Sequence, residues 1–454
     1  MTDPRQPSRV LRILNLLTVV RAGEARTALL LALNVFLILT AYYILKTVRE
    51  ALILGESTAE VKSYLAAGQV GVLAILVPVY GRLVARFPRI RLINIVTAFF
   101  AVCPVVFYAL AQFGVPLGMI YFVWIGVFSL MIVAQFWSFA NDVYSKEEGE
   151  RLLVLVGLGA SLGAVFGSRV ADRLIEPFGV LQLMLVGAAV LGLQLLLTNY
   201  IDHTERARRP RPAPVKKSAA APSQNAFAMV FRTRYLLLMA LMILMINWIN
   251  ATGEYILGGI VKNNAIAMIA NGTAGGLSEG QIIGDFYAKY FSLANALGLV
   301  LQLFVVSRVI KHRGVAVAVM ILPALSFGVY NVLLFMPLLN AALAAKVIEN
   351  STDYSLNNTV RNMLFLPCTY EQKFAAKQAI DSFFVRMGDV LSAALVFAGT
   401  TLMALPIQGF AAVNAVLAVG ALILAWQVGR HYKALTSTTA ASPLPVGAAK
   451  AVAS

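Results

Sequence analysis

The chain has 454 residues, of which 59% are hydrophobic and only 13% are charged. A soluble globular protein carries about 25% charged residues, so this composition excludes a soluble protein. Backbone polar groups in lipid must pair within the structure, and the apolar runs of this chain are too long for barrel strands. The sequence therefore predicts an all-α membrane protein that crosses the bilayer many times.

The net charge is +16, which in a soluble protein would suggest nucleic acid as a partner. Here many Lys and Arg residues lie in short connections between apolar runs, where the positive-inside rule places them on the cytoplasmic side. Topology accounts for most of the charge, and an anionic substrate would account for the rest. We expect a lipid bilayer and a small anion as partners, no nucleic acid, and a monomer. Cys103 and Cys368 lie in or next to apolar runs and predict no disulfide.

In chain order, residues 1–26 are predicted to form a basic cytoplasmic arm. The apolar run at residues 27–54 is much longer than the core of a signal peptide, so we expect a retained first helix. The predicted spans are 27–54, 63–84, 91–112, 117–140, 152–174, 179–200, 235–262, 286–307, 315–336, 338–362, 377–404 and 407–430.

The twelve predicted spans fall into two halves of six, at residues 27–200 and 227–433. A Pro- and Ala-rich basic linker at residues 201–226 separates them, and residues 434–454 are predicted to form a disordered tail. A basic turn ends the second span of each half, as GRLVAR at residues 81–86 and SRVIKHRG at residues 307–314. This repetition favours a duplicated, major-facilitator-like transporter. Basic residues gather in alternate connections, which predicts an inner (cytoplasmic) membrane protein with both termini in the cytoplasm.

The first span carries Lys46, Arg49 and Glu50, and spacings of three and four place them on one face of the helix. A charge inside a membrane costs about 2.5–3.5 kcal/mol on insertion scales and marks a functional site by default. Lys46 lies about 12 Å from the end of the run, so we expect it to face the protein interior. Glu50 and Arg49 are closer to the end and are expected to reach the interface.

Three further groups of polar residues lie within predicted spans. Trp137 and Asn141 belong to QFWSFAND at residues 135–142, which Glu148 follows; an aromatic belt and a capped helix start are the structural alternative. Glu254 follows NWINATG at residues 247–253, a segment that suggests a broken helix, and pairing or a transport role is favoured for it. Lys377 and Arg386 begin the eleventh span, where Arg386 and Asp389 are three residues apart and suited to pair.

Catalytic and cofactor motifs are not supported. GASLG at residues 159–163 matches the nucleophile elbow G-x-S-x-G, but it lies within an apolar run with no preceding strand. Gly159, Gly163 and Gly167 are four residues apart and indicate close helix packing instead. The sequence has no Walker A motif and no cluster of Cys and His. We therefore predict neither an enzyme nor a bound metal or cofactor.

Several of these stretches together resemble the non-mitochondrial ATP/ADP translocase family of plastids and intracellular bacteria, which is related to the major facilitators. LKTVREAL at residues 45–52 is similar to the family pattern L-R-x-x-K-D-x-L, and FWSFAN at 136–141 to F-W-G-F-A-N. EGER at 148–151 with GLGA at 157–160 resembles its E-A-K-R and glycine run. YSL at 354–356 and KQAID at 377–381 resemble Y-S-L and G-K-x-A-I-D. The resemblance implies exchange of adenine nucleotides by alternating access, with Arg49, Glu254, Lys377 and Glu148 as charged residues on which transport depends.

The first hypothesis is therefore an antiporter of ATP and ADP or a related phosphorylated anion. Lys46, Arg49, Lys377 and Arg386 would bind phosphate, because Lys and Arg are its usual ligands. Glu254 would be a gating or coupling acid, and aromatic side chains such as Trp137 could stack on a base. Two alternatives stay open: a proton-coupled major facilitator for another solute, and a membrane scaffold that transports nothing.

Overall fold

The computed structural model describes residues 20–21, 24–144, 146–208, 226–369, 372 and 376–441. Most of the predicted basic arm, linker and tail lies outside this part of the chain. Within it, every regular element is an α-helix or a π-helical segment, which confirms the all-α prediction. The first six long helices are α2 (Ala25–Glu56), α3 (Ala59–Arg86), α4 (Arg89–Gln112), α5 (Gly118–Val143), α6 (Lys146–Phe178) and α7 (Gln182–Arg208).

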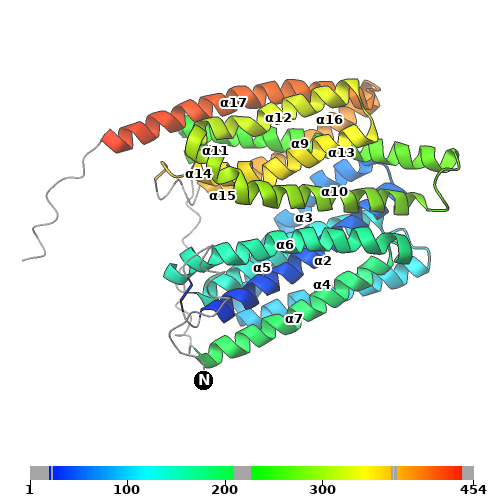
Figure 1. Ribbon diagram of the computed structural model, residues 1–454, viewed down its shortest axis with the longest axis horizontal. Coiled ribbons are helices and arrows are strands. Elements are labelled where there is room, and N and C mark those ends of the chain that lie inside the picture. Colours follow the sequence, from blue (N-terminus) through cyan, green and yellow to red (C-terminus); the bar gives the residue numbers. More distant parts are fainter. Residues whose placement is uncertain are drawn as a thin grey trace, which may run out of the picture. The chain divides into compact units, whose positions relative to one another are not determined.

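A second series of helices follows residue 225 (Figure 1). It comprises α8 (Ala226–Arg232), α9 (Arg234–Ala270), α10 (Glu279–Phe304), α11 (Val306–Arg313), α12 (Val315–Phe335), α13 (Leu339–Thr352), η1 (Asp353–Asn357), α14 (Asn358–Met363), α15 (Lys377–Ala379), η3 (Ile380–Phe384), α16 (Val385–Phe397), η4 (Ala398–Leu402) and α17 (Ile407–Ala441). The three η segments are π-helical turns within longer helices, and such turns are frequent at functional sites.

The predicted spans correspond to these helices. Ten helices of the described chain are long and apolar enough to cross a membrane, and α10 with α11 forms an eleventh candidate that bends by 46°. The remaining predicted span, residues 338–362, corresponds to the continuous run of α13, η1 and α14. This run carries four charged residues, Lys346, Glu349, Asp353 and Arg361.

Two boundaries differ from the prediction. The polar, Gly-rich loop expected at residues 263–285 is much shorter, because α9 continues to Ala270 and α10 begins at Glu279. The extra turns of α9 are rich in Ala, Ile and Met, which are adequate helix formers despite the two Asn residues that precede them. At the other end of the chain, α17 continues to Ala441 and so extends into the segment that the sequence predicts to be disordered.

The chain divides into two compact units. Unit 1 comprises Met1–Lys216 and Leu257–Leu299, and unit 2 comprises Lys217–Ile256 and Val300–Ser454. In unit 1, α2 packs against α5, α6 and α7, and in unit 2 α12 packs against α13 and α17. The proposed duplication of six helices and six helices remains a prediction.

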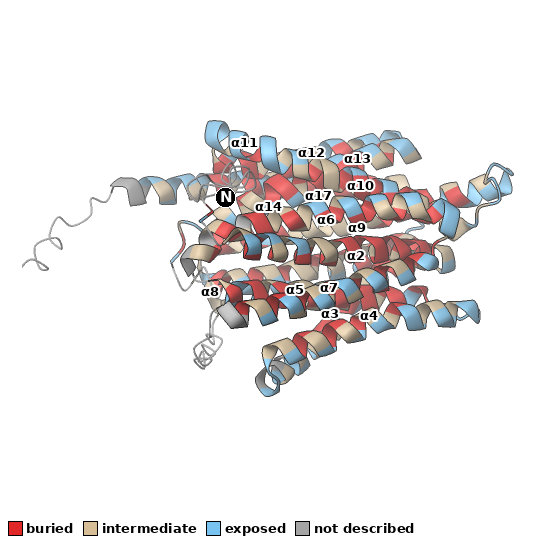
Figure 2. Cartoon of the chain, turned by 60° about the horizontal axis from the view of Figure 1, so that its bottom comes forward, coloured by how far each residue is buried: buried red, intermediate tan, exposed pale blue. Residues whose placement is uncertain are grey.

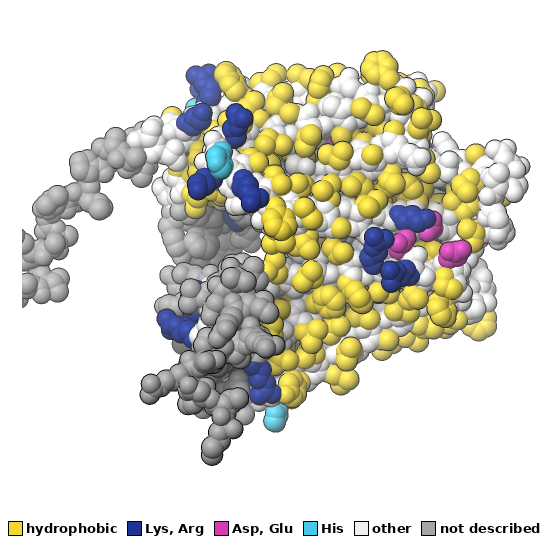
Figure 3. Space-filling model, viewed as in Figure 1, with side chains coloured by type: hydrophobic (Ala, Val, Ile, Leu, Met, Phe, Trp, Pro, Cys, Tyr) yellow, Lys and Arg dark blue, Asp and Glu magenta, His cyan; other side chains and the backbone are white. Residues whose placement is uncertain are grey.

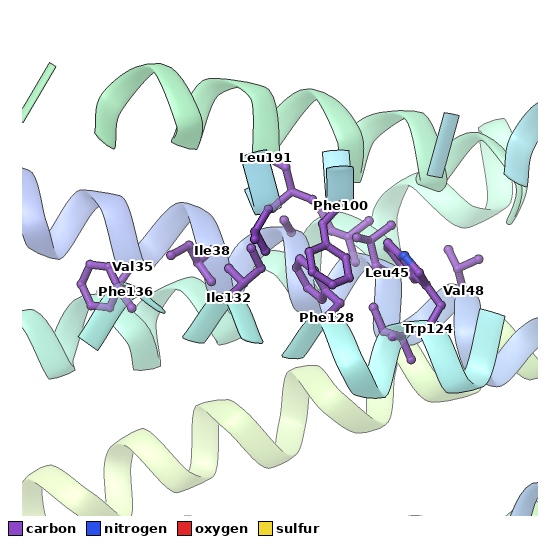
Figure 4. Packing of buried hydrophobic residues seen from close by; sticks show 14 of the residues in the cluster. Val35, Ile38, Leu45, Val48, Phe100, Trp124, Phe128, Ile132, Phe136 and Leu191 are labelled. Atoms are coloured by element: carbon purple, nitrogen blue, oxygen red, sulfur yellow. The ribbon is translucent and has the colours of Figure 1, made fainter. Parts of the chain in front are cut away.

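The core of unit 1 is formed by large apolar side chains from α2, α4, α5 and α7 (Figure 4). The rings of Trp124 and Phe128 stack at a centroid distance of 5.6 Å, and Phe100 meets Phe128 edge to face at 5.4 Å. Leu45 and Val48 of α2 are fully buried in this cluster. Because a helix repeats every 3.6 residues, burying these two residues turns Lys46 and Arg49 toward a different side of α2.

Exposed residues lie along the outer faces of the helices (Figure 2), and the face seen in Figure 3 is largely apolar, as lipid requires. Phe99, Leu196 and Val416 are more than half exposed. Lys and Arg side chains gather over α11, the helix that ends in the second basic turn (Figure 3). Gly314 closes that turn with φ of +75°, a conformation that glycine adopts without strain.

Close packing of α6 on α2 confirms the predicted role of the glycine row. A Cβ atom on Gly159, Gly163 or Gly167 would lie 2.3, 2.3 or 2.4 Å from the carbonyl oxygen of Ala32, Phe36 or Thr40. The three glycines therefore let the two backbones touch, which excludes a nucleophile elbow at this position.

Candidate functional site

The charged residues of α2 form a buried group with Lys62 of α3. The Arg49 Nε atom donates to Glu50 Oε1 at 3.0 Å, and Lys62 Nζ lies 2.7 Å from Glu50 Oε2. The side chain of Glu50 is 0% exposed, and those of Lys62 and Arg49 are 7% and 15% exposed. The prediction that Glu50 reaches the interface is therefore wrong. Glu50 is buried because two cations compensate its charge, and the trio keeps a net positive charge.

Aromatic rings surround the two cations of α2. The ammonium of Lys46 lies 4.2 Å from the ring centroid of Phe291 and 5.3 Å from that of Tyr43. The guanidinium of Arg49 lies 4.8 Å from the ring centroid of Phe122. Lys46 thus faces protein rather than acyl chains, in agreement with its predicted interior orientation. A cation over an aromatic face is stabilised without being neutralised, so it can still attract an anion.

Glu254, in unit 2, lies beside a cation that the sequence did not lead us to expect. Its Oε1 atom lies 3.8 Å from Nζ of Lys346 on α13, and Lys346 donates to Glu349 Oε2 at 2.7 Å. The helix is not broken at residues 250–253, since α9 is continuous from Arg234 to Ala270. The polar residues of that segment bind neighbouring helices: Asn250 accepts from Lys346 at 3.2 Å, and Thr252 shares a hydrogen bond with Ser392.

Lys262, eight residues after Glu254, binds elsewhere. Its ammonium donates to the carbonyl oxygens of Leu54 and Ser57 at 2.6 and 2.8 Å and pairs with Glu279 at 3.0 Å. Lys262 and these three partners belong to unit 1, where Lys262 covers the carbonyl end of α2. A cation at the C-terminus of a helix is favourable because the last carbonyl groups carry negative partial charge.

The two cations at the start of the eleventh span have polar partners in unit 2. Lys377 donates to Asn362 Oδ1 at 2.8 Å and lies over the ring of Phe365. Arg386 pairs with Asp389 at 3.4 Å, as its spacing predicted. Asp389 also accepts from Asn247 of α9 at 2.9 Å. Both cations are half-buried. The hydrogen-bond partner of Lys377 is a neutral amide, and that of Arg386 is one carboxylate.

The structure separates Trp137 and Asn141 from the charged group of α2. Arg49 contacts Phe122, and Trp137 lies 15 residues further along α5, which corresponds to about 22 Å of helix. Trp137 is half-buried and meets Phe136 edge to face, and Asn141 is exposed. At that end of α5, Arg89 donates to Ser138 and pairs with Asp142. Packing accounts for Trp137 in this arrangement.

Glu148 lies in the first turn of α6, near an ion pair that sequence reasoning missed. Arg151 donates through both Nη atoms to the Glu24 carboxylate, at 2.9 and 3.1 Å. Glu24 precedes α2, so the pair joins the beginnings of α2 and α6. The Arg151 guanidinium lowers the pKa of Glu24 below its ordinary value. The residues are 127 apart in the chain, so no local spacing could have revealed the contact.

We predict that Glu24→Gln lowers stability by about 1 kcal/mol at neutral pH, because a bidentate pair near the surface contributes on this order. A carboxyl group with a lowered pKa stabilises the fold above its unfolded pKa, and this contribution is lost as pH falls through the lowered value. The difference in Tm between the parent and the variant should therefore be constant above about pH 5.5 and vanish in acid. Thermal melting in detergent across pH measures it. In an Arg151→Gln background the Glu24 substitution should have no further effect, and an undiminished effect there would contradict the prediction.

No group of three or more His, Cys, Asp and Glu residues in the described part of the chain could hold a metal ion. Each unit instead holds a buried group of charged side chains on membrane-spanning helices. Such groups can bind a charged solute and exchange partners with it.

Comparisons with known proteins agree with this architecture. The chain is 23% identical over 303 residues to ADP,ATP carrier protein 1 of Chlamydia pneumoniae, covering 57% of this chain and 56% of the carrier. It is 23% identical over 481 aligned residues to ADP,ATP carrier protein 2 of Chlamydia trachomatis serovar D, covering 87% of this chain and 86% of the carrier. The chain thus spans about half the length of the first carrier and most of the second.

The fold is similar to that of the nucleoside transporter NupG, with a TM-score of 0.61 at 12% identity over 90% of this chain and 99% of that one. Many apolar helices with buried charged groups, together with the family match given next, define a multi-pass membrane transporter of small molecules rather than an enzyme. The family model of the Major Facilitator Superfamily matches residues 27–366, and the chain belongs to that superfamily. Its likeness to the ADP,ATP carriers confirms the resemblance that the sequence motifs indicated.

Proposed function

We propose that this chain is an antiporter that exchanges adenine nucleotides, ATP and ADP, or a closely related phosphorylated anion, by alternating access. The observation that supports this most strongly is the similarity to an ADP,ATP carrier across 87% of the chain. The net positive group of Arg49, Glu50 and Lys62, with Lys46 on the same helix, suits a substrate that carries several negative charges. We place the transporter in the inner membrane with both termini in the cytoplasm, on the basis of its basic connections.

In this proposal Lys46, Arg49, Lys377 and Arg386 bind the phosphates, and Glu254 is the acid that couples binding to the change of conformation. Trp137 and Asn141 lie near the C-terminal end of α5, and Glu148 lies at the start of α6. We propose these three residues as contacts that the substrate makes as it enters or leaves. We expect the transporter to act as a monomer.

Exchange in proteoliposomes tests this function. Vesicles loaded with ADP should take up labelled ATP, and empty vesicles should not. Arg49→Ala and Lys377→Ala should each lower exchange at least about 30-fold, since losing a partly buried charge contact costs about 2 kcal/mol or more. Lys289→Ala is the matched control, because Lys289 is 55% exposed and pairs with Asp285 one turn before it on the same helix. Absence of exchange with several nucleotides would reject this substrate class.

Proton-coupled uptake of another solute is the second candidate, and the position of Glu254 favours it. This carboxylate is 26% exposed and lies beside a buried ammonium, so both a solute and a proton could reach it. Uptake driven by a proton gradient, without any counter-substrate in the vesicles, would support this alternative over exchange.

A further inference from the structure

A closed hydrogen-bond network in unit 2 lies behind Glu254. Glu349 accepts from Ser326 through Oε1 at 2.7 Å, and from Tyr330 and Lys346 through Oε2 at 3.0 and 2.7 Å. Ser326 and Tyr330 belong to α12, and Lys346 and Glu349 to α13. Each oxygen of Glu349 has a donor, so its carboxylate is fixed in place from two helices.

Lys346 occupies the centre of this network. Its side chain is 0% exposed, and its ammonium donates to Glu349 and, at 3.2 Å, to Asn250 of α9. Spacing of three residues on α13 holds it against Glu349, so it has little freedom to move. Glu254 lies 3.8 Å away, too far for a hydrogen bond but within the range of an ion pair.

Exposure distinguishes the two carboxylates that share this ammonium. Glu349 is 4% exposed and Glu254 is 26% exposed. Glu254 also accepts a long hydrogen bond from Asn350, at 3.4 Å. The network therefore has a buried, fixed part and one carboxylate that can reach a solute or a proton.

Backbone packing brings Glu254 to this position. A Cβ atom on the preceding residue, Gly253, would lie 1.9 Å from the Tyr330 hydroxyl and 3.0 Å from Lys346 Nζ. Only glycine lets α9 approach the buried pair this closely. The close contact between α9 and the network therefore depends on Gly253, the residue that precedes Glu254.

We propose that Lys346 is a positioning residue for Glu254, whose buried ammonium keeps that carboxylate ionised and in place during the transport cycle. This inference rests on the proposed role of Glu254 in transport. Glu349 holds the Lys346 ammonium in place, and the hydroxyl groups of Tyr330 and Ser326 in turn hold the Glu349 carboxylate.

Removing Lys346 alone would leave Glu349 buried without its ammonium and could prevent folding. The double variant Lys346→Gln/Glu349→Gln removes the close pair as a unit, and the amide oxygen introduced at position 349 can still accept from the two hydroxyl groups. In this variant the Glu254 carboxylate has lost the ammonium 3.8 Å away, and the Glu349 charge that is removed with it makes no direct contact with Glu254 that would offset the loss, so Glu254 should be protonated at higher pH. The other titratable groups facing Lys346, namely Tyr330 and Asp353, remain in both proteins.

The first measurement is nucleotide exchange across pH. We expect the double variant to fold, to lose at least about ten-fold in exchange at pH 7, and to show an acid limb displaced upward by about one pH unit or more. Lys346→Arg keeps the charge and should keep the acid limb in place, even if its rate falls. Exchange and a pH profile that match the parent within two-fold in the double variant would overturn the proposal.

The second measurement does not depend on any substrate. A hydrophobic carbodiimide reacts with protonated carboxyl groups, and mass spectrometry reports its adduct on Glu254. At pH 7 we expect several-fold more adduct in the double variant than in the parent, and no increase in the matched control Lys289→Gln/Asp285→Asn, which removes an exposed pair. Equal labelling of parent and double variant would overturn the proposal. If the parent exchanges no nucleotide, the proposed function fails, and the labelling still decides whether Lys346 controls Glu254.

Discussion

Replacing Glu50 with Gln is expected to destabilise unit 1 by about 3–5 kcal/mol and to abolish transport. Glu50 is fully buried and contacts both Arg49 and Lys62, so its carboxylate compensates two cations at once. A Gln side chain keeps the shape but provides no negative charge. Two buried cations would then repel each other within a low dielectric, where charges interact far more strongly than in water.

Thermal melting and exchange measured on the same preparation would test this expectation. Asp285→Asn provides the matched control, because it also removes one carboxylate from an ion pair on a membrane helix. That pair is exposed, so the change should stay within about 0.5 kcal/mol.

A double variant separates charge from packing. Glu50→Gln/Lys62→Gln removes one charge of each sign and should recover part of the stability lost in Glu50→Gln alone. Arg49 keeps the net charge of the group at +1, so the double variant should also recover part of transport if that charge attracts the substrate. A Glu50→Gln protein as stable as Asp285→Asn would show that the buried trio contributes nothing to the fold.

The order of the helices and the charged face of α2 could be predicted because both depend on local sequence. Long apolar runs identify spans, and a Lys or Arg within such a run is rare enough to mark a site. The pairing of Glu50 with Lys62 could not be predicted in this way. Lys62 lies one residue before the predicted second span and belongs to a different helix, so only the fold brings the two together.

Unit 2 contains a pair that local spacing does indicate. Lys346 and Glu349 lie three residues apart within a predicted span, which is the spacing of a helical ion pair. This pair was not among the predicted site residues, and the polar segment at residues 353–362 follows it closely. The partner of Glu254 could not be predicted from local spacing, because Lys346 lies on a different helix and only the fold brings the two side chains together.

The eight predicted site residues show the same limit. Lys46 and Arg49 are found on one face because four helical residues nearly complete a turn. Trp137 and Asn141 were predicted from a polar and aromatic group within a span, and Trp137 lies about four turns of α5 beyond Phe122, the ring that Arg49 contacts. The relative positions of residues on one helix can thus be predicted from their spacing. Whether residues on two different helices lie at the same level in the membrane depends on where each helix begins, which the spacing does not give.

Replacing Gly163 with Ala is expected to cost at least about 3 kcal/mol, at the upper end of overpacking effects. The new Cβ atom would lie 2.3 Å from the Phe36 carbonyl oxygen and 2.8 Å from the Phe36 Cα atom, and backbone cannot rotate away as a side chain could. The helix α2 would have to shift, and with it Lys46 and Arg49, so exchange should fall together with stability.

Gly157 on the same helix provides a control, because the same substitution there should raise stability instead of lowering it. A Cβ atom there meets nothing within 4 Å, so Gly157→Ala should stabilise α6 by roughly 0.5–1 kcal/mol through its better helix propensity. Thermal melting of the two variants therefore compares the same chemical change, six residues apart, with and without a neighbouring backbone. If both substitutions shifted Tm in the same direction, α6 would not pack on α2 through its glycine row, and the position of the charged face of α2 would need another cause.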